Sequence, residues 1–343
     1  MRSSISSSDP WQRAPALPWL RVWVTALALT ALAIAGLETL GRSAGLTPNV
    51  EDSPRLWAHV RDAASSHGGP IVLLGSSRVQ VGIDPEILAP TVGRPVLQLA
   101  LNGASPLPFL HDLARDPSFR GSVVCGVPPA AVFGDRAGWD ERARQQLAFR
   151  GNRAWIERFE TPARLWMQQR TVLTLPQMAP ARLVRTLASG ELPAPGAVMM
   201  KRSRFEAMDY QAMRARGLGH GRGDESPLVR KAPPDVVRQR LQVVADDVAS
   251  IRERGGELWF VRMPTTADVA GGEDETFGAD AMARLADVTK ALVLDARAEP
   301  TMARFDCGDG VHLDVRDARL FTAELGRWLV DHGLEPDSDR AQY

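Results

Sequence analysis

Two short motifs in the sequence carry side chains that could act together in nucleophilic catalysis. The first is Gly-Ser-Ser-Arg at residues 75–78, and the second is Asp-Gly-Val-His at residues 309–312. A carboxylate three residues before a histidine can hold one imidazole nitrogen, while the other nitrogen takes a proton from a serine hydroxyl. Ser77, Asp309 and His312 are therefore the candidate catalytic residues.

Each motif taken alone also has an ordinary structural interpretation. A serine that follows a strand commonly caps the next helix. Asp309 or Asp314 could likewise cap a helix that the sequence predicts over residues 317–331. Only His312 of the six histidines follows an aspartate at this spacing, which makes the second motif a specific pattern.

Short apolar runs predict the strands that would carry these motifs. Uninterrupted runs of this kind are typical of strands buried on both faces of a parallel sheet. Helical patterns at 108–115 and 234–254 separate several of the runs. Repeated strand–helix units favour a three-layer, flavodoxin-like α/β sandwich, in which ligands bind beyond the carboxyl ends of the strands. The five candidate strands are Ile71–Leu74, Val96–Leu101, Val123–Cys125, Leu258–Val261 and Ala291–Leu294.

A long stretch, residues 131–233, separates the third and fourth candidate strands and contains no clear strand pattern. We expect a largely helical insertion there. Its large apolar residues could cap a cleft, but a satellite helical core is the simpler interpretation. Its arginines are interpreted as a solvated face. The apolar residues are Trp139, Trp155, Trp166 and Met167, and the arginines are Arg202, Arg204, Arg214 and Arg216.

The N-terminal part of the chain contains an apolar run, Val22–Leu37, that reaches almost the length of a bilayer span when residues 17–21 are added. The sequence therefore predicts a transmembrane anchor over residues 17–40. A cleaved signal peptide is the alternative, since Ala33-Ile34-Ala35 could serve as its cleavage site.

The charges around this run predict its orientation. Arg2, Arg13 and Arg21 precede most of it against the single acid Asp9. Positive residues favour the cytoplasmic side, so we expect residues 1–16 in the cytoplasm. The rest of the chain would then lie outside, in the periplasm if the source is a Gram-negative bacterium, and the protein would be a single-pass protein of the inner membrane.

Composition argues against several classes of protein. Lys+Arg and Asp+Glu both total 41, so the chain has no basic surplus that would hold a nucleic acid. Two cysteines cannot build a disulfide framework, and we expect Cys125 and Cys307 to be thiols near the carboxyl edge of the sheet. Neither an HExxH motif nor a pair of CxxC motifs is present, so we expect no metal and no other cofactor.

Together, the order and position of the two motifs resemble the SGNH (GDSL-like) hydrolase family. In that family a Gly-Asp-Ser-like block after the first strand supplies the nucleophile, and a C-terminal Asp-x-x-His supplies the acid and the base. Ser77 falls at the nucleophile, with Ser76 in place of the usual aspartate. The variant block behind one N-terminal helix is most similar to DltD-type D-alanyl transfer proteins and other membrane-anchored envelope acyl-transfer proteins.

The resemblance covers residues 70–335 apart from the insertion, after a linker and leading helix in 41–69 and before a tail at 336–343. It implies an oxyanion hole made by the amides of Ser77 and Gly103, with the Asn102 side chain as a further donor. The family's third block normally holds an asparagine, but this chain has Gly-Val-Pro-Pro at 126–129. Losing one oxyanion donor can lower the rate about a hundredfold or more, unless Asn102 replaces it.

The function implied by the resemblance is a serine acyl esterase or O-acyltransferase that acts on an envelope glycan, with a membrane-embedded acyltransferase as a potential partner. Arg78 and Arg262, which adjoin strand ends, could bind a charged substrate, although an ion pair is the simpler role for Arg262. A non-catalytic accessory protein of a polysaccharide export or modification complex is the alternative. A dinucleotide- or phosphate-binding domain is disfavoured, because neither a GxGxxG motif nor a P-loop follows any candidate strand.

Overall fold

The computed structural model describes residues 18–66, 68–135, 138–217 and 229–335, so the predicted segments 1–16 and 336–343 lie outside the described residues. The chain divides into two compact units. Unit 1 comprises Met1–Pro48 and Arg170–Pro195. Unit 2 comprises Asn49–Gln169 and Gly196–Tyr343 and contains the sheet.

Unit 2 is an α/β unit built on a five-stranded sheet, in the order β2-β1-β3-β8-β9. All neighbouring strands in this sheet run parallel. The five runs predicted from the sequence are all strands; β1 has the predicted bounds, and the ends of the others shift by at most three residues. The strands are β1 (Ile71–Leu74), β2 (Val96–Gln98), β3 (Ser122–Gly126), β8 (Leu258–Arg262) and β9 (Leu292–Asp295).

The edge strand β2 ends at Gln98, whereas the apolar run predicts a strand that reaches Leu101. The buried Arg204 side chain donates through Nη1 to the carbonyls of Gln98 (2.9 Å) and Ala100 (3.0 Å). A guanidinium thus occupies carbonyl groups that a further strand would otherwise pair with. This contact protects the open edge of the sheet.

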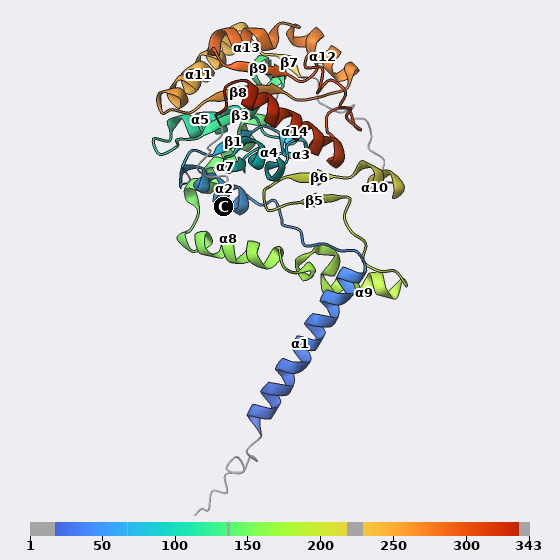
Figure 1. The fold of residues 1–343 in the computed structure, drawn as a ribbon. Coiled ribbons are helices and arrows are strands. Elements are labelled where there is room, and N and C mark those ends of the chain that lie inside the picture. Colours follow the sequence, from blue (N-terminus) through green and yellow to red (C-terminus); the bar gives the residue numbers. More distant parts are fainter. Residues whose placement is uncertain (1–17, 67, 136–137, 218–228, 336–343) are drawn as a thin grey trace, which may run out of the picture. The chain divides into compact units, whose positions relative to one another are not determined.

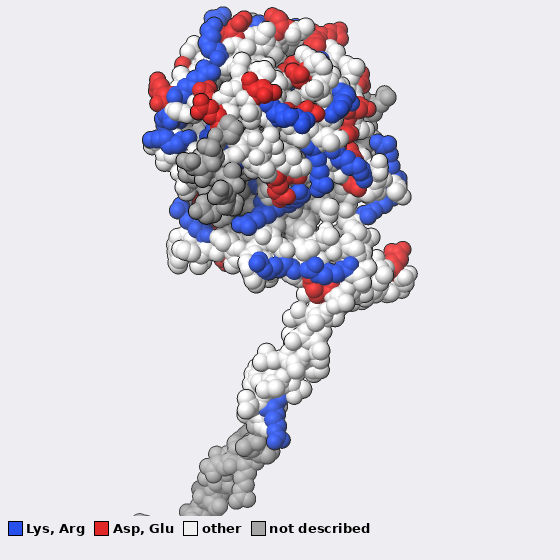
Figure 2. All heavy atoms as spheres, viewed as in Figure 1, with Lys and Arg blue, Asp and Glu red and all other residues white. Residues whose placement is uncertain are grey.

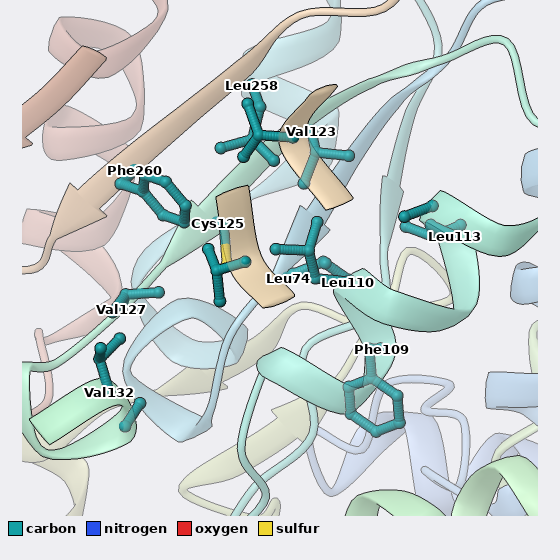
Figure 3. Close-up of a cluster of buried hydrophobic side chains, with 14 of the residues drawn as sticks. Leu74, Phe109, Leu110, Leu113, Val123, Cys125, Val127, Val132, Leu258 and Phe260 are labelled. Atoms are coloured by element: carbon teal, nitrogen blue, oxygen red, sulfur yellow. The ribbon is translucent and has the colours of Figure 1, made fainter. Parts of the chain in front are cut away.

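Helices pack on both faces of the sheet, because alternate strand residues point to opposite sides. Val72 and Leu74 belong to one buried cluster, while Ile71 and Leu73 belong to the other. Figure 1 shows the arrangement, and Figure 3 shows Leu74 in the first cluster beside helix α5. The first cluster includes α2 (Pro54–Ser66), α5 (Leu107–Arg115), α11 (Pro234–Glu253) and α13 (Ala281–Thr289); the second includes α3 (Ser77–Gly82), α4 (Pro85–Val92) and α14 (Val315–Asp331).

The insertion is less purely helical than predicted, since it contains two small antiparallel sheets. Strands of two or three residues are too short to leave a periodic pattern in the sequence. The pairs are β4 (Gly134–Asp135) with β7 (Arg230–Lys231), and β5 (Val198–Met200) with β6 (Glu206–Met208). The helices of this region are α6 (Pro129–Phe133), α7 (Trp139–Asn152), α8 (Trp155–Gln168), α9 (Pro180–Ala188) and α10 (Tyr210–Ala215).

Two interpretations of the insertion are wrong. Trp155, Trp166 and Met167 do not form a satellite core, because all three side chains are exposed. The arginines are not all a solvated face, since Arg204 is fully buried. Its guanidinium binds the Asp52 carboxylate through Nε (2.8 Å) and Nη2 (3.0 Å), which balances its charge.

Unit 1 contains the apolar helix α1 (Trp19–Ser43), which is long and apolar enough to cross a membrane. Near its C-terminal end, the Glu38 carboxylate accepts hydrogen bonds from Thr171 Oγ1 (2.6 Å) and Val172 N (3.1 Å). These bonds fix the start of the second segment of unit 1 on α1. A small apolar core completes the unit, formed by Leu46, Val172, Leu175, Met178 and Leu183.

Candidate functional site

Ser77 is the first residue of α3, which begins directly beyond the carboxyl end of β1. The glycine of the motif has a packing role, because a Cβ at Gly75 or at Gly126 would overlap the Val79 side chain. Both glycines therefore let the first turn of α3 sit tightly on the strand ends. The Ser77 amide has no hydrogen-bond acceptor among the described residues, as is common in a first helical turn.

The loop that carries His312 is held at the same edge of the sheet. Cys307 Sγ contacts Pro264 O (3.3 Å), and Gly310 O accepts from Thr266 N (3.0 Å), both just beyond β8. Val79 of α3 and Leu313 belong to one buried cluster. Two motifs that are distant in the sequence thus meet in the same region of unit 2.

Within this loop, Asp309 holds His312 directly. The Asp309 Oδ2 to His312 Nδ1 distance is 2.7 Å, and Oδ1 accepts from the amides of Val311 (3.1 Å) and His312 (2.9 Å). The predicted contact between the two side chains is therefore confirmed. The alternative role as a helix cap falls to Asp314 instead, which accepts from Arg316 N at the start of α14.

The charge state of this pair follows from its contacts. Burial raises the pKa of Asp309, but the hydrogen bond and charge of His312 and the two amides outweigh it and hold that pKa well below its usual range. An ionised carboxylate can only accept hydrogen bonds, so Nδ1 of His312 must carry a proton. In the neutral ring Nε2 is then the acceptor, as a general base requires.

Nε2 of His312 is buried and has no hydrogen-bond partner in the part of the chain that the structure describes. A buried polar atom without a partner costs free energy and calls for an explanation. Ser77, which is half-buried, does not supply the partner, since the two side chains form no hydrogen bond. The Asp309–His312 pair is thus formed, whereas a hydrogen bond between His312 and Ser77 is not.

Gly103 has the backbone geometry of a tight turn after β2. Its φ of +70° lies in the left-handed region, which glycine adopts without strain. Its amide has no acceptor among the described residues, whereas the neighbouring Asn102 amide donates to Gln80 Oε1 (3.0 Å). Asn102 itself is exposed. The amides of Ser77 and Gly103 are both available as donors.

A buried polar network fixes the Asn102–Gly103 turn relative to α3. Gln80 of α3 accepts from the Asn102 amide and donates through Nε2 to Asp52 Oδ2 (2.6 Å). Asp52 in turn binds the buried Arg204. Sequence reasoning missed this network, because its members, Asp52, Gln80, Asn102 and Arg204, come from four separate segments without a local motif.

Arg78 and Arg262 are both occupied by carboxylates. Glu273 of α12 (Ala267–Phe277) bridges them, with 2.9 Å from Oε1 to Arg78 Nη1 and 2.9 Å from Oε2 to Arg262 Nη2. Arg262 is only 2% exposed and also pairs with Asp274 (2.8 Å) and Asp295 (3.4 Å). Ion pairing, the simpler role considered for Arg262, is the one observed.

Two further residues near the site were not predicted. Tyr210 is buried, and its pKa is raised by burial and then by the charge and hydrogen bond of Asp309. Burial and the Asp52 charge raise the pKa of Glu206, while the His312 and Arg204 charges oppose that rise. Both residues come from the insertion, where Tyr210 starts α10 and Glu206 starts β6. Their sequence context carries no catalytic spacing that could have found them.

The two cysteines are free thiols, as predicted. Burial and the Asp309 charge raise the pKa of Cys307 to about 12, so the thiol stays protonated at neutral pH. Cys125 is buried in the cluster on the other face of the sheet. Among the described residues, no group of three or more His, Cys, Asp or Glu side chains is arranged to hold a metal ion.

Comparison of the sequence with protein-family models and with curated proteins finds no match. The function must therefore be inferred from the residues of the site and from their geometry.

Proposed function

We propose that this protein is an SGNH-type serine acyl esterase or O-acyltransferase, held at a membrane by α1. The proposal rests on the hydrogen bonding of His312. Asp309 fixes its Nδ1, and its buried Nε2 has no partner among the described residues, at the sheet edge where α3 begins with Ser77. This is the arrangement of a general base that awaits a nucleophile.

In the proposed mechanism, Ser77 Oγ attacks an acyl carbonyl while His312 Nε2 takes the serine proton. The carbonyl oxygen becomes an oxyanion, which the amides of Ser77 and Gly103 stabilise. His312 then gives its proton to the departing alcohol, and an acyl ester remains on Ser77. Water or a sugar hydroxyl then attacks that ester and loses its proton to His312. The bond from the acyl carbon to Ser77 Oγ breaks, and His312 returns the proton to Oγ, which restores the free serine. Substrate binding must first bring Ser77 to His312, since catalytic hydrogen bonds are often long without substrate.

The strand order supports the family assignment. Counted along the sheet strands alone, the order is 2-1-3-4-5, which is that of flavodoxin-like folds. In such sheets the ligand crevice lies outside the carboxyl ends of the strands. The Ser77 and His312 loops both lie beyond such ends.

We test the chemistry with a fluorophosphonate probe, which forms a covalent bond with activated serines. The purified full chain in detergent is expected to carry one adduct on Ser77, identified by peptide mass spectrometry. Ser77→Ala should lose the adduct. Ser76→Ala is the matched control, because Ser76 is the neighbouring hydroxyl and makes no capping hydrogen bond. Labelling that survives in Ser77→Ala would contradict the proposal.

We further propose that unit 2 lies outside the cytoplasm, where an envelope glycan would be its acyl acceptor or donor. The support is the excess of arginine before α1. A reporter fused after Tyr343 should be active only outside the cytoplasm, and activity inside would contradict this topology.

A non-catalytic accessory protein is the second candidate. Two observations favour it: Gly-Val-Pro-Pro stands where the family's asparagine is expected, and Ser77 and His312 form no hydrogen bond. A Ser77→Ala variant that still supports glycan modification in cells would favour this candidate over the enzyme.

A further inference from the structure

One helix of unit 2 turns its apolar side chains away from the unit. The inner face of α8 is buried through Thr161, Leu165 and Gln168, and Leu165 packs with Val50 and Leu56. The outer face carries large apolar side chains with high exposed fractions. These are Trp155 (72%), Ile156 (47%), Phe159 (69%), Trp166 (60%) and Met167 (47%).

These five residues, which we call the α8 stripe, lie on one face of the helix. At about 100° per residue their positions fall within roughly a third of the helix circumference, opposite the buried residues. Trp155 and Phe159 also contact each other edge to face, with ring centroids 6.0 Å apart. A surface helix normally turns polar residues to water, so a stripe of this kind marks an interaction surface.

We propose that the α8 stripe binds a lipid membrane at the level of the headgroups. Tryptophan and phenylalanine are enriched where apolar rings meet the interface of a bilayer. Arg158, which is exposed, flanks the stripe on one side and suits anionic headgroups. On the other side, exposed Arg164 pairs with Glu51 (3.8 Å), and Glu160 is also exposed. Figure 2 shows the surface over α8 as largely uncharged.

The same chain supplies a reason for a membrane to be present. It contains α1, a helix long and apolar enough to cross a bilayer. α8 ends at Gln168, and the chain enters unit 1, which contains α1, at Arg170. A tethered surface meets its target at a high effective concentration, so even a weak interfacial contact would be populated. The inference goes beyond the proposed chemistry and holds whether or not Ser77 is a nucleophile.

The test uses the full chain in lipid nanodiscs with Phe159→Cys labelled by an environment-sensitive fluorophore. Both native thiols are buried, so the new cysteine is the one that reacts under native conditions. Leu320→Cys is the matched control, because Leu320 is an isolated apolar residue on α14 that is 55% exposed. Nitroxide lipids, with the spin label near the headgroup, act as quenchers.

The proposal predicts a blue shift and strong quenching for the label at 159, and neither for the label at 320. Equal quenching at both positions would mean non-specific adsorption and would overturn it. A label at 159 that is not quenched would also overturn it. A blue shift at 159 that persists without lipid and grows with protein concentration would assign the stripe to a second copy of the chain instead.

Discussion

Two clusters of charged residues lie beyond strand ends of the same sheet, and they differ in how their charges are used. Arg262, at the end of β8, is enclosed by the carboxylates of Glu273, Asp274 and Asp295. His312 is bound by one carboxylate through Nδ1, while Nε2 has no partner among the described residues. In the first cluster the charges pair with one another, whereas in the second Nε2 of His312 is available to a ligand or a nucleophile.

Position at the carboxyl edge of the sheet therefore does not by itself indicate chemistry. Burial raises the pKa of Asp295, but the ion pairs to Arg297 and Arg262 lower it by more, so the pKa lies below its usual value. Asp309 also has a lowered pKa, yet its partner is a histidine that could move a proton. What separates the two clusters is the partner, since a guanidinium can only donate hydrogen bonds, whereas a neutral imidazole donates through one nitrogen and accepts through the other.

The largest effect is expected from His312→Ala. Removing a triad base should slow the reaction with the fluorophosphonate by about 10⁴-fold or more. His332→Ala is the control, because His332 stacks on Trp328 (4.1 Å between centroids) at the end of α14 and has no place in the proposed chemistry. Stopped-flow labelling measures both rates. An equal loss of labelling rate in both variants would show that the reactive residues are not those around His312.

Asp309→Asn tests the role of Asp309 through the reaction rate and through the pH dependence of stability. The variant should lose about 10⁴-fold in rate at neutral pH, since the amide cannot hold the same tautomer. The pKa of Asp309 is lowered in the folded state, so its contribution to stability is present above the unfolded value of about 4 and is lost as pH falls below it. Chemical denaturation across pH should therefore show a deficit in the variant at pH 7 that shrinks towards pH 3. A constant deficit would contradict this account.

Arg262→Met tests the cluster in which Arg262 is enclosed by carboxylates. It removes the cation that three carboxylates share, but Glu273 keeps Arg78, and Asp274 and Asp295 keep Arg297. The free energy of unfolding should therefore fall by about 1–3 kcal/mol. Ser77 labelling of the folded fraction should persist, because Arg262 has no role in proton transfer. Denaturant unfolding and adduct yield are measured on the same sample. Loss of labelling with unchanged stability would show that Arg262 binds the substrate or takes part in the reaction, and would contradict this account.

The smallest effect is expected from Tyr210→Phe. The variant removes a hydrogen bond to the Asp309 carboxylate, which should lower the rate by about tenfold or less and the stability by about 1 kcal/mol. The pKa of Asp309 should rise towards its unfolded value, so the loss of stability that begins near pH 4 should be smaller and should be complete at a higher pH. A purely structural role for Tyr210 would lower stability without moving this acid limb.

The sheet was largely predictable because each strand is buried on both faces and therefore appears as an unbroken apolar run. The helix predicted over 54–66 matches α2, and that predicted over 317–331 begins two residues late against α14. The early end of β2 was not predictable, because the apolar run continues to Leu101 and the amides of Leu99 and Leu101 still donate to the carbonyls of Leu73 and Gly75. The short strands β5 and β6 were not predictable either, since they depend on pairing with each other.

The site was predictable only where it is local in sequence. Asp309 and His312 are three residues apart, so their spacing predicted the hydrogen bond that the structure shows. Gly103 was expected as a donor, and its positive φ and available amide agree with that role. Tyr210 and Glu206 reach the site through the folding of the insertion, which no spacing in the sequence encodes.

The most direct test of the central claim is a crystal structure of the full chain after reaction with the fluorophosphonate. The account predicts a bond from Ser77 Oγ to phosphorus, with His312 Nε2 within about 3 Å of an adduct oxygen. The phosphoryl oxygen should accept from the amides of Ser77 and Gly103, at about 2.7–3.1 Å. An adduct on another residue, or a His312 ring that remains farther from Ser77 than one bridging water, would contradict the proposed triad.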